Sequence, residues 1–332
     1  MIPIRDTVRS KNVPIINNLL IGINVVMFAV QLLQGSEMEF QRFVYLYGLV
    51  PARYTVPHWA QGVTWFHQAT ALVSFMFLHG GFFHLLGNMW SLYIFGDNVE
   101  DRLGPLRYAI FYMLCGVISG LTHLVLNANS TAPTIGASGA VAGVMGAYFL
   151  LHPKSKILTL IPIIIIPWFV EIPAFFFLGI WFLIQLVNAS GSFGAASGIA
   201  WWAHIGGFVC GMLMLKVFGA LPATGFSAGL RKTTARKKSH RFQVARPSAA
   251  DRNMDMHATI AISEYEALVG TRKVVSVPYG FKRRMFRVDV PAGMEAGKFL
   301  RLRGQGASMP GGKRGDLILK VVVQTNPTTP ST

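Results

Sequence analysis

The chain has 332 residues, of which 52% are hydrophobic and only 13% are charged. Soluble domains carry about 25% charged residues, so this composition does not fit a soluble protein and indicates an integral membrane protein. The net charge of +16 is uneven, because residues 1–220 hold 10 Lys/Arg and 7 Asp/Glu whereas residues 221–332 hold 20 and 7. We therefore expect a membrane part followed by a basic tail, which beside a membrane favours anionic headgroups over nucleic acid as a partner.

Apolar runs of the length that a membrane helix needs, about 20 residues, recur along the first part of the chain. They predict six helices, over about 14–34, 81–97, 106–127, 136–151, 172–188 and 199–219. Residues 35–68 are too polar to span, and residues 69–80 are expected to dip into the membrane as a loop. Prolines interrupt the run 157–170, which we expect to be an irregular apolar connection.

Basic residues set the orientation, since cytoplasmic loops carry an excess of Lys and Arg. With six spans, one side receives nearly all of them, whereas the other side has only Arg42 and Arg53. Both termini are therefore expected in the cytoplasm. No cleavable signal peptide and no organelle-targeting segment is evident, which favours a prokaryotic plasma membrane.

The tail divides into a linker and a domain. Seven basic residues lie between Arg231 and Arg246, in a stretch that is either a flexible tether or a site for lipid headgroups. Short β-rich runs follow over 274–277, 286–290, 299–303 and 317–323. The expected fold is thus an all-α, six-helix polytopic domain over 1–219, a linker over 220–252 and a small cytoplasmic antiparallel β domain over 253–326.

Four polar residues interrupt the apolar helices: His84, Asn88, Ser138 and His204. Polar groups inside a membrane are costly and tend to be functional. His84 and Asn88 are four residues apart and share a helical face. At 1.5 Å per residue, all four lie roughly 5–12 Å below the outer surface. Their common depth in three helices predicts a single site.

This set of side chains suits acyl-transfer chemistry. Ser138 would be the nucleophile and His204 the general base that takes its proton and returns it to the leaving amine. His84, Asn88 and the backbone N–H of Ser138 would stabilise the oxyanion. No carboxylate is placed to orient His204, so a dyad is the simplest mechanism. The alternative for each residue alone is an ordinary hydrogen bond within or between helices.

Small residues surround the serine and recur on the last helix. Gly136 and Gly139 flank Ser138, Gly139 pairs with Gly143, and Gly207 pairs with Gly211 at the spacing that lets membrane helices approach closely. These glycines predict that the fourth and sixth helices bring Ser138 to His204.

Other chemistries find little support in the sequence. It has no HExxH motif and no pair of intramembrane aspartates, and His79 and His84 are spaced poorly for sharing a metal on one helical face. No metal and no cofactor is expected. Cys115 and Cys210 lie in apolar runs, where we interpret them as packing residues.

Four segments in this order resemble the rhomboid family of intramembrane serine proteases. They are HGGFFHLLGN at 79–88, FGDNVEDRLG at 95–104, GASG at 136–139 and AHIGG at 203–207. The resemblance implies six helices around a water-accessible cavity, Ser138 as nucleophile, His204 as base, and His84 with Asn88 in the oxyanion hole. It also implies that transmembrane segments enter laterally beside the fifth helix and are cut near their outer end.

Two positions depart from the patterns of many rhomboids. Trp65 is followed by Phe66 where many members have Trp-Arg, and Ala142 stands where some members place an aromatic ring against the histidine. Neither departure removes a catalytic group, but the second leaves open how His204 is held.

Residues of about 254–325 resemble the C-terminal peptide-binding domain of DnaJ-type co-chaperones, through VSVP at 275–278, VPAG at 290–293, GKFLRLRGQG at 297–306 and GKRGDL at 312–317. The resemblance implies binding of extended peptide; the alternative is a passive β module. The sequence has no His-Pro-Asp motif and no CxxC zinc module.

Together these features predict a serine endopeptidase that cleaves transmembrane substrates, with a β domain that recruits substrate tails. The sequence leaves two alternative functions. A non-proteolytic rhomboid-like protein that escorts membrane clients would be expected to lose Ser138 or His204. A transporter would need charged residues along a path through the bilayer, which the first four helices and the sixth lack.

Overall fold

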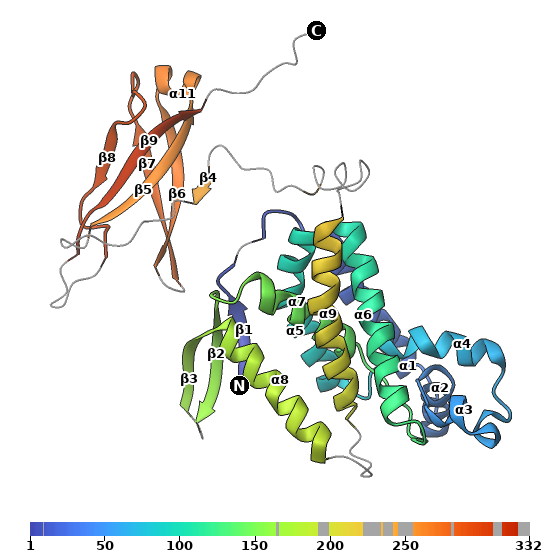
Figure 1. Cartoon of the computed structure of the whole chain (residues 1–332). Helices are drawn as coiled ribbons and strands as arrows, with labels where there is room; N and C mark the ends of the chain where they lie inside the picture. The colour runs from blue at the N-terminus through green and yellow to red at the C-terminus, as the bar shows by residue number, and fades with distance from the viewer. Residues whose placement is uncertain are drawn as a thin grey trace, which may run out of the picture. The chain divides into compact units, whose positions relative to one another are not determined.

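The computed structural model describes residues 1–8, 10–163, 166–191, 199–221, 234, 242–244, 255–279, 282–307 and 314–324. The chain divides into two compact units, Met1–Arg236 and Lys237–Thr332 (Figure 1). The linker expected over 220–252, with its basic stretch between Arg231 and Arg246, lies largely outside the described residues.

The first unit contains a helix at each of the six expected places, which confirms an all-α polytopic region. The helices are α1 (Ile15–Leu32), α5 (Phe82–Leu103), α6 (Pro105–Leu126), α7 (Ser138–Leu151), α8 (Ala174–Gly191) and α9 (Trp201–Ala220). Four of them, α1, α6, α8 and α9, are each long and apolar enough to cross a membrane. With 14 residues, α7 is about 21 Å long, shorter than a hydrocarbon core of about 30 Å.

The segment before α5 is helical rather than a loop. It forms α2 (Glu37–Tyr47), α3 (Ala52–Thr55), η1 (Pro57–Ala60), α4 (Trp65–Ser74) and η2 (Phe75–Phe77), so the loop expected over 69–80 is wrong for most of its length. Side-chain caps explain two of these helices, because Ser36 and Thr64 accept hydrogen bonds from backbone N–H groups at the starts of α2 and α4. The segment Trp65–Phe77, which comprises α4 and η2, is bent by 73° relative to α5.

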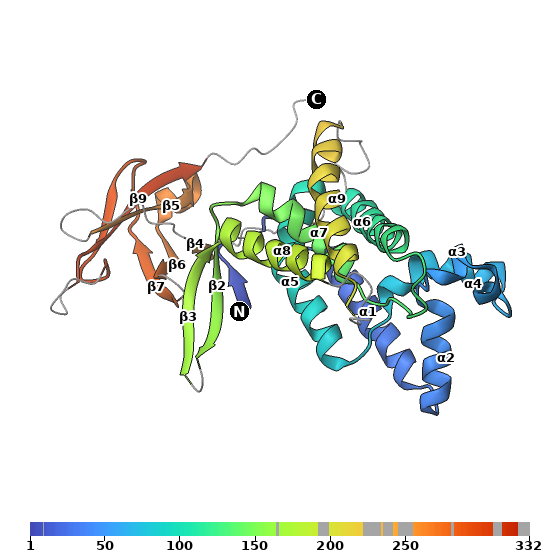
Figure 2. The ribbon, with the colours of Figure 1, turned by 60° about the horizontal axis from the view of Figure 1, so that its bottom comes forward.

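The irregular connection expected over 157–170 is also wrong. Strands β2 (Lys156–Ile163) and β3 (Ile166–Pro173) form an antiparallel hairpin, and β1 (Ile2–Asp6) adds to β2. Pro162 lies beyond the part of β2 that pairs with β1, and Pro167 lies on the edge strand β3, positions where a missing N–H is tolerated. This sheet lies on the opposite side of the helices from α2, α3 and α4 (Figures 1 and 2).

The short helix α7 is the centre of the first unit. It packs against α9, α6 and α5, and every residue from Gly139 to Tyr148 is buried. The outer helix α1 is held to this group by polar contacts at its start. The Glu100 carboxylate on α5 accepts hydrogen bonds from the backbone N–H groups of Ile16 at 3.1 Å and Asn17 at 2.8 Å, where the preceding Pro14 supplies no side-chain cap.

The second unit is a β domain, as predicted, with mixed rather than purely antiparallel sheets. Its strands are β4 (Phe242–Val244), β5 (Met256–Ser263), β6 (Thr271–Tyr279), β7 (Lys282–Val290), β8 (Phe299–Leu302) and β9 (Leu317–Gln324). They form two sheets, β4-β6-β7 and β5-β9-β8, in which β4/β6 and β5/β9 are parallel pairs. Alternate residues of both sheets build one hydrophobic core.

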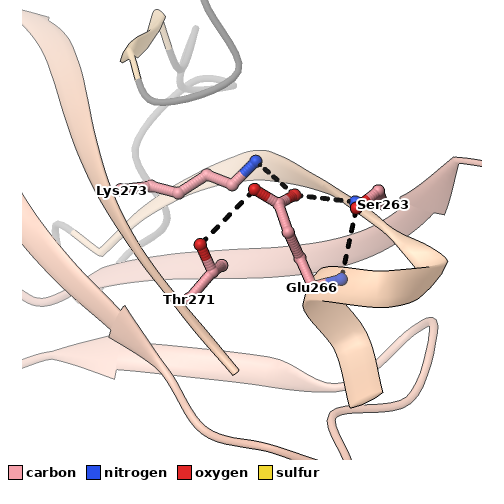
Figure 3. A network of polar contacts seen from close by, with 4 residues as sticks. All are labelled: Ser263, Glu266, Thr271 and Lys273. Carbon is pink, nitrogen blue, oxygen red and sulfur yellow. Dashed lines mark hydrogen bonds and ion pairs between the residues drawn. The ribbon is translucent and has the colours of Figure 1, made fainter. Parts of the chain in front are cut away.

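An ion pair with a buried lysine lies where the helix α11 (Glu264–Val269) follows β5 (Figure 3). Ser263 and Glu266 form a capping box, and the Glu266 carboxylate also contacts the Lys273 ammonium at 2.7 Å. The Lys273 side chain is only 1% exposed. Burial acts to raise the pKa of Glu266, but the bonds from Lys273 and Ser263 outweigh it and hold that pKa below its ordinary value.

We expect Glu266→Ala to destabilise the β domain by about 3 kcal/mol or more, because it leaves the buried Lys273 charge without its partner and removes the capping box. Hydrogen exchange of the β5 and β6 amides in the full chain measures the effect. The double variant with Lys273→Met is the matched control, since it removes both charges and is expected to recover most of the protection. Equal protection in the Glu266→Ala variant and the unaltered protein would contradict this account.

Candidate active site

The structure brings Ser138 and His204 into contact across two helices. Ser138 is the first residue of α7, and His204 lies in the first turn of α9. The His204 Nε2 atom lies 2.8 Å from the Ser138 Oγ atom, which is hydrogen-bonding distance. The two residues are 66 positions apart in the sequence, so the packing of α7 on α9 creates the pair.

Glycines make this approach possible, because the backbones of α7 and α9 touch. A Cβ atom built on Gly207 would lie 2.0 Å from the carbonyl oxygen of Gly139, and one built on Gly211 would lie 1.9 Å from that of Gly143. Real Cβ atoms do not approach so closely, so neither position on α9 accepts a side chain without moving the helices apart.

Gly136 shapes the turn that leads into Ser138. Its φ angle is +129°, a conformation that residues with a Cβ rarely adopt. A Cβ there would also lie 2.8 Å from the Nε2 atom of His84. Glycine at this position therefore both sets the direction of the chain before α7 and leaves room for the His84 ring.

The two polar residues of α5 face the same place. The backbone N–H of Gly80 donates to His84 Nδ1 at 3.4 Å, so in the neutral ring Nε2 carries the proton and is a donor. Asn88 is buried, and its Nδ2 atom has no hydrogen-bond partner among the described residues. His84 Nε2 and Asn88 Nδ2 are thus two donors available to a ligand.

These side chains line one cavity of about 880 Å³. Its walls come from α2, α5, α6, α7, α8 and α9, from η2 and from the segment 127–136. They include His84, Asn88, Ser138, Trp181, Trp201 and His204. The four polar residues predicted from the sequence therefore share one cavity. His79 does not line it; its buried ring contacts the ring of His84, at 5.2 Å between centroids. Cys115 and Cys210 are free and buried.

Sequence reasoning missed the residues of α8 and α9 that contact His204. Trp181 and Trp201 lie with ring centroids 6.0 and 6.1 Å from the imidazole, and Gln185 Oε1 lies 2.9 Å from His204 Nδ1. Ala142 in α7 is fully buried and has no ring to place against the imidazole. Trp181, Trp201 and Gln185 surround the imidazole instead. The available signal was Gln185 itself, the first amide in an apolar helix that begins at Ala174.

We expect Gly207→Ala to destabilise the first unit by about 1–3 kcal/mol or more, because overpacking forces helices apart. Thermal unfolding in detergent measures this. Gly219→Ala is the matched control on the same helix, since a Cβ there meets nothing within 4 Å. Indistinguishable melting temperatures for the two variants would contradict the close contact of α7 with α9.

Each of the two parts of the chain matches a known protein family. Residues 66–220 match the family model of the rhomboid domain, and residues 241–329 match that of the DnaJ C terminal domain. RHOMBOID-like protein 1 of Arabidopsis thaliana is 31% identical over 160 residues, which cover 48% of this chain and 37% of that protein. The putative rhomboid protease YdcA of Bacillus subtilis is 31% identical over 124 residues, or 34% and 59% of the two chains.

A third relative carries a different description. Inactive RHOMBOID-like protein 8 of Arabidopsis thaliana is 33% identical over 104 residues, covering 30% of this chain and 29% of that protein. The chain thus spans less than two thirds of the length of each of these relatives. Together with four helices long and apolar enough to cross a membrane and a separate β unit, the comparisons indicate an integral membrane protein, of which residues 66–220 match the rhomboid domain and residues 241–329 match the DnaJ C terminal domain.

Proposed function

We propose that this protein is an intramembrane serine endopeptidase that cleaves transmembrane segments of other proteins near the outer face of the membrane. The observation that carries the proposal is the 2.8 Å contact between Ser138 Oγ and His204 Nε2, inside a cavity that is also lined by the N–H donors of His84 and Asn88. A serine is a weak nucleophile until an adjacent base takes its proton, and this pair has the geometry for that step.

The reaction begins when His204 Nε2 takes the proton of Ser138 and Oγ bonds to the substrate carbonyl carbon. The negative charge that develops on the carbonyl oxygen is stabilised by His84, Asn88 and the backbone N–H of Ser138 at the start of α7. His204 then gives its proton to the amide nitrogen as the C–N bond breaks. Water attacks the resulting ester, His204 takes its proton, and Ser138 leaves with that proton.

The place of the site along the helix axis supports a substrate cut within the membrane. Helix α7 is shorter than the hydrocarbon core, so with its last residue at the cytoplasmic surface its first residue lies below the outer surface. That first residue is Ser138, and the cavity therefore places the reaction inside the membrane. Transmembrane helices are the substrates that reach it. The distribution of Lys and Arg supports a topology in which both termini lie in the cytoplasm. We propose a prokaryotic plasma membrane as the location.

A rhomboid-like protein that binds membrane clients without cutting them is the second candidate function. The relative described as inactive favours it. The retained contact between Ser138 and His204 favours the protease instead, since a binding protein does not need a base aimed at a serine hydroxyl.

Cleavage of a transmembrane reporter by the full chain in liposomes tests the proposal. We expect Ser138→Ala and His204→Ala to abolish cleavage, and Asn88→Ala to lower its rate by about 10²–10³, the usual cost of one oxyanion donor. Ser91→Ala is the matched control, because Ser91 lines the same cavity and is expected to be dispensable. Cleavage that persists without Ser138, or no cleavage by folded protein of any reporter tried, would contradict the protease.

We further propose that the domain over 253–326, joined to the membrane domain over 1–219 by the linker over 220–252, binds extended cytoplasmic tails of substrates. Strands β7 and β8 are edge strands, each paired on one side only among the described strands, and they expose Met285 and Phe299. An exposed edge with apolar side chains can bind a peptide as an added strand.

Removal of residues 221–332 tests this role. We expect a reporter with a long cytoplasmic tail to be cut more slowly through a higher KM, while a reporter without the tail is cut at an unchanged rate. Identical kinetics for both reporters with and without the domain would make it a passive module.

A further inference from the structure

His204 has a second polar contact that the dyad does not use. Its Nδ1 atom, on the far side of the ring from Ser138, lies 2.9 Å from the Oε1 atom of Gln185 on α8. Gln185 is buried, with 4% of its surface exposed. A buried amide must find partners for its oxygen and its nitrogen, and both partners determine which way it points.

The nitrogen of the amide settles its orientation. Gln185 Nε2 donates to the backbone carbonyl oxygen of Trp181 at 3.0 Å, one turn earlier on the same helix. That carbonyl can only accept, so the group facing it must be the amide nitrogen. Rotating the amide by half a turn would place two oxygens against each other, and therefore Oε1 faces His204.

The orientation of the amide in turn determines the tautomer of the histidine. Oε1 can only accept, so Nδ1 of His204 must carry a proton. A neutral imidazole has one N–H group, which leaves Nε2 with a lone pair directed at the Ser138 hydroxyl. A general base at Ser138 requires this tautomer; the other one would present an N–H donor to the serine and could not take its proton.

We propose that Gln185 is a positioning residue that fixes the reactive tautomer and the orientation of His204, so that a Ser138–His204–Gln185 chain performs the work of the dyad. The proposal rests on the proposed protease function. Gln185 does not touch the substrate; it acts through the ring. Its carbonyl dipole also faces the positive charge that the imidazole acquires on taking the serine proton, and hydrogen bonds to a charged group are the stronger ones.

The aromatic neighbours restrict the ring in the remaining directions. Trp181 lies against it with an interplanar angle of 36° and Trp201 with one of 89°. Aromatic walls define where the imidazole can lie, but they cannot distinguish its two nitrogens. Gln185 makes that distinction, and it does so from α8, a helix that carries neither Ser138 nor His204.

Three substitutions separate positioning from packing. Gln185→Met keeps the length of the side chain and removes the oxygen. Gln185→Glu keeps an oxygen for Nδ1 but replaces the nitrogen that donates to Trp181. Ser190→Ala is the matched control on α8, because Ser190 is exposed and bonds only to the carbonyl of Val187 among the contacts described. Each variant is made in the full chain, and its thermal unfolding is recorded.

The readouts are kcat and KM for a transmembrane reporter and the rate at which a fluorophosphonate labels the serine. We expect Gln185→Met to lower kcat and the labelling rate by about 10-fold to 10²-fold, with KM changed less than about threefold. This loss is at or below the lower end of the roughly 10²-fold to 10⁴-fold that a general base contributes, because Gln185 acts through the base and is not the base itself. Gln185→Glu is expected to recover most of that loss, and Ser190→Ala to match the unaltered protein.

Equal losses in Gln185→Met and Gln185→Glu would overturn the inference, since they would trace the effect to the bond with Trp181. An unchanged rate in Gln185→Met would overturn it as well. If Gln185→Met does not fold, Gln185→Glu decides: kcat near that of the unaltered protein supports positioning, and kcat lower by 10-fold or more contradicts it. The proposed protease fails separately, if the unaltered protein is not labelled or is still labelled after Ser138→Ala.

Discussion

The close contact between the backbones of α7 and α9 is the constraint on which the rest of the site depends. Gly139 and Gly143 on α7 meet Gly207 and Gly211 on α9, and no space remains for a Cβ at either of these two α9 positions. In a membrane, packing of this kind rather than the hydrophobic effect holds helices together. The contact fixes the relative height of the two helices, which sets the Ser138 to His204 distance. The other elements of the unit pack around it.

The remaining helices complete the site from outside that contact. Helix α5, which follows a bend of 73° after η2, supplies His84 and Asn88. Helix α8 supplies the amide that contacts the histidine. Acyl transfer needs a base in one tautomer and donors directed at one oxygen, and here these groups come from four different helices. We therefore infer that the packing of the four helices holds the groups in the geometry that the reaction needs.

The sequence predicted the helices well because apolar length is a strong signal in membrane proteins, and it predicted the four polar residues because such groups are rare there. It failed where local patterns are ambiguous. The apolar, proline-containing residues 157–163 and 166–170 pair with each other as strands, and the first of these strands also pairs with β1 near the N-terminus, a partner that the local pattern does not predict. The parallel pairing of β5 with β9 joins segments about 60 residues apart, and alternation along one strand contains no information about its neighbour. Gln185 was visible as the first amide of an apolar helix, but only the packing of α8 on α9 brings it to His204.

The most direct test of the central claim is the mass spectrum of the purified full chain after reaction with a fluorophosphonate in detergent. An activated serine in the proposed site predicts one covalent adduct, located by peptide mapping on Ser138 and absent from the His204→Ala variant. The account is contradicted if folded protein forms no adduct, or if the adduct lies on another serine such as Ser91 in the same cavity.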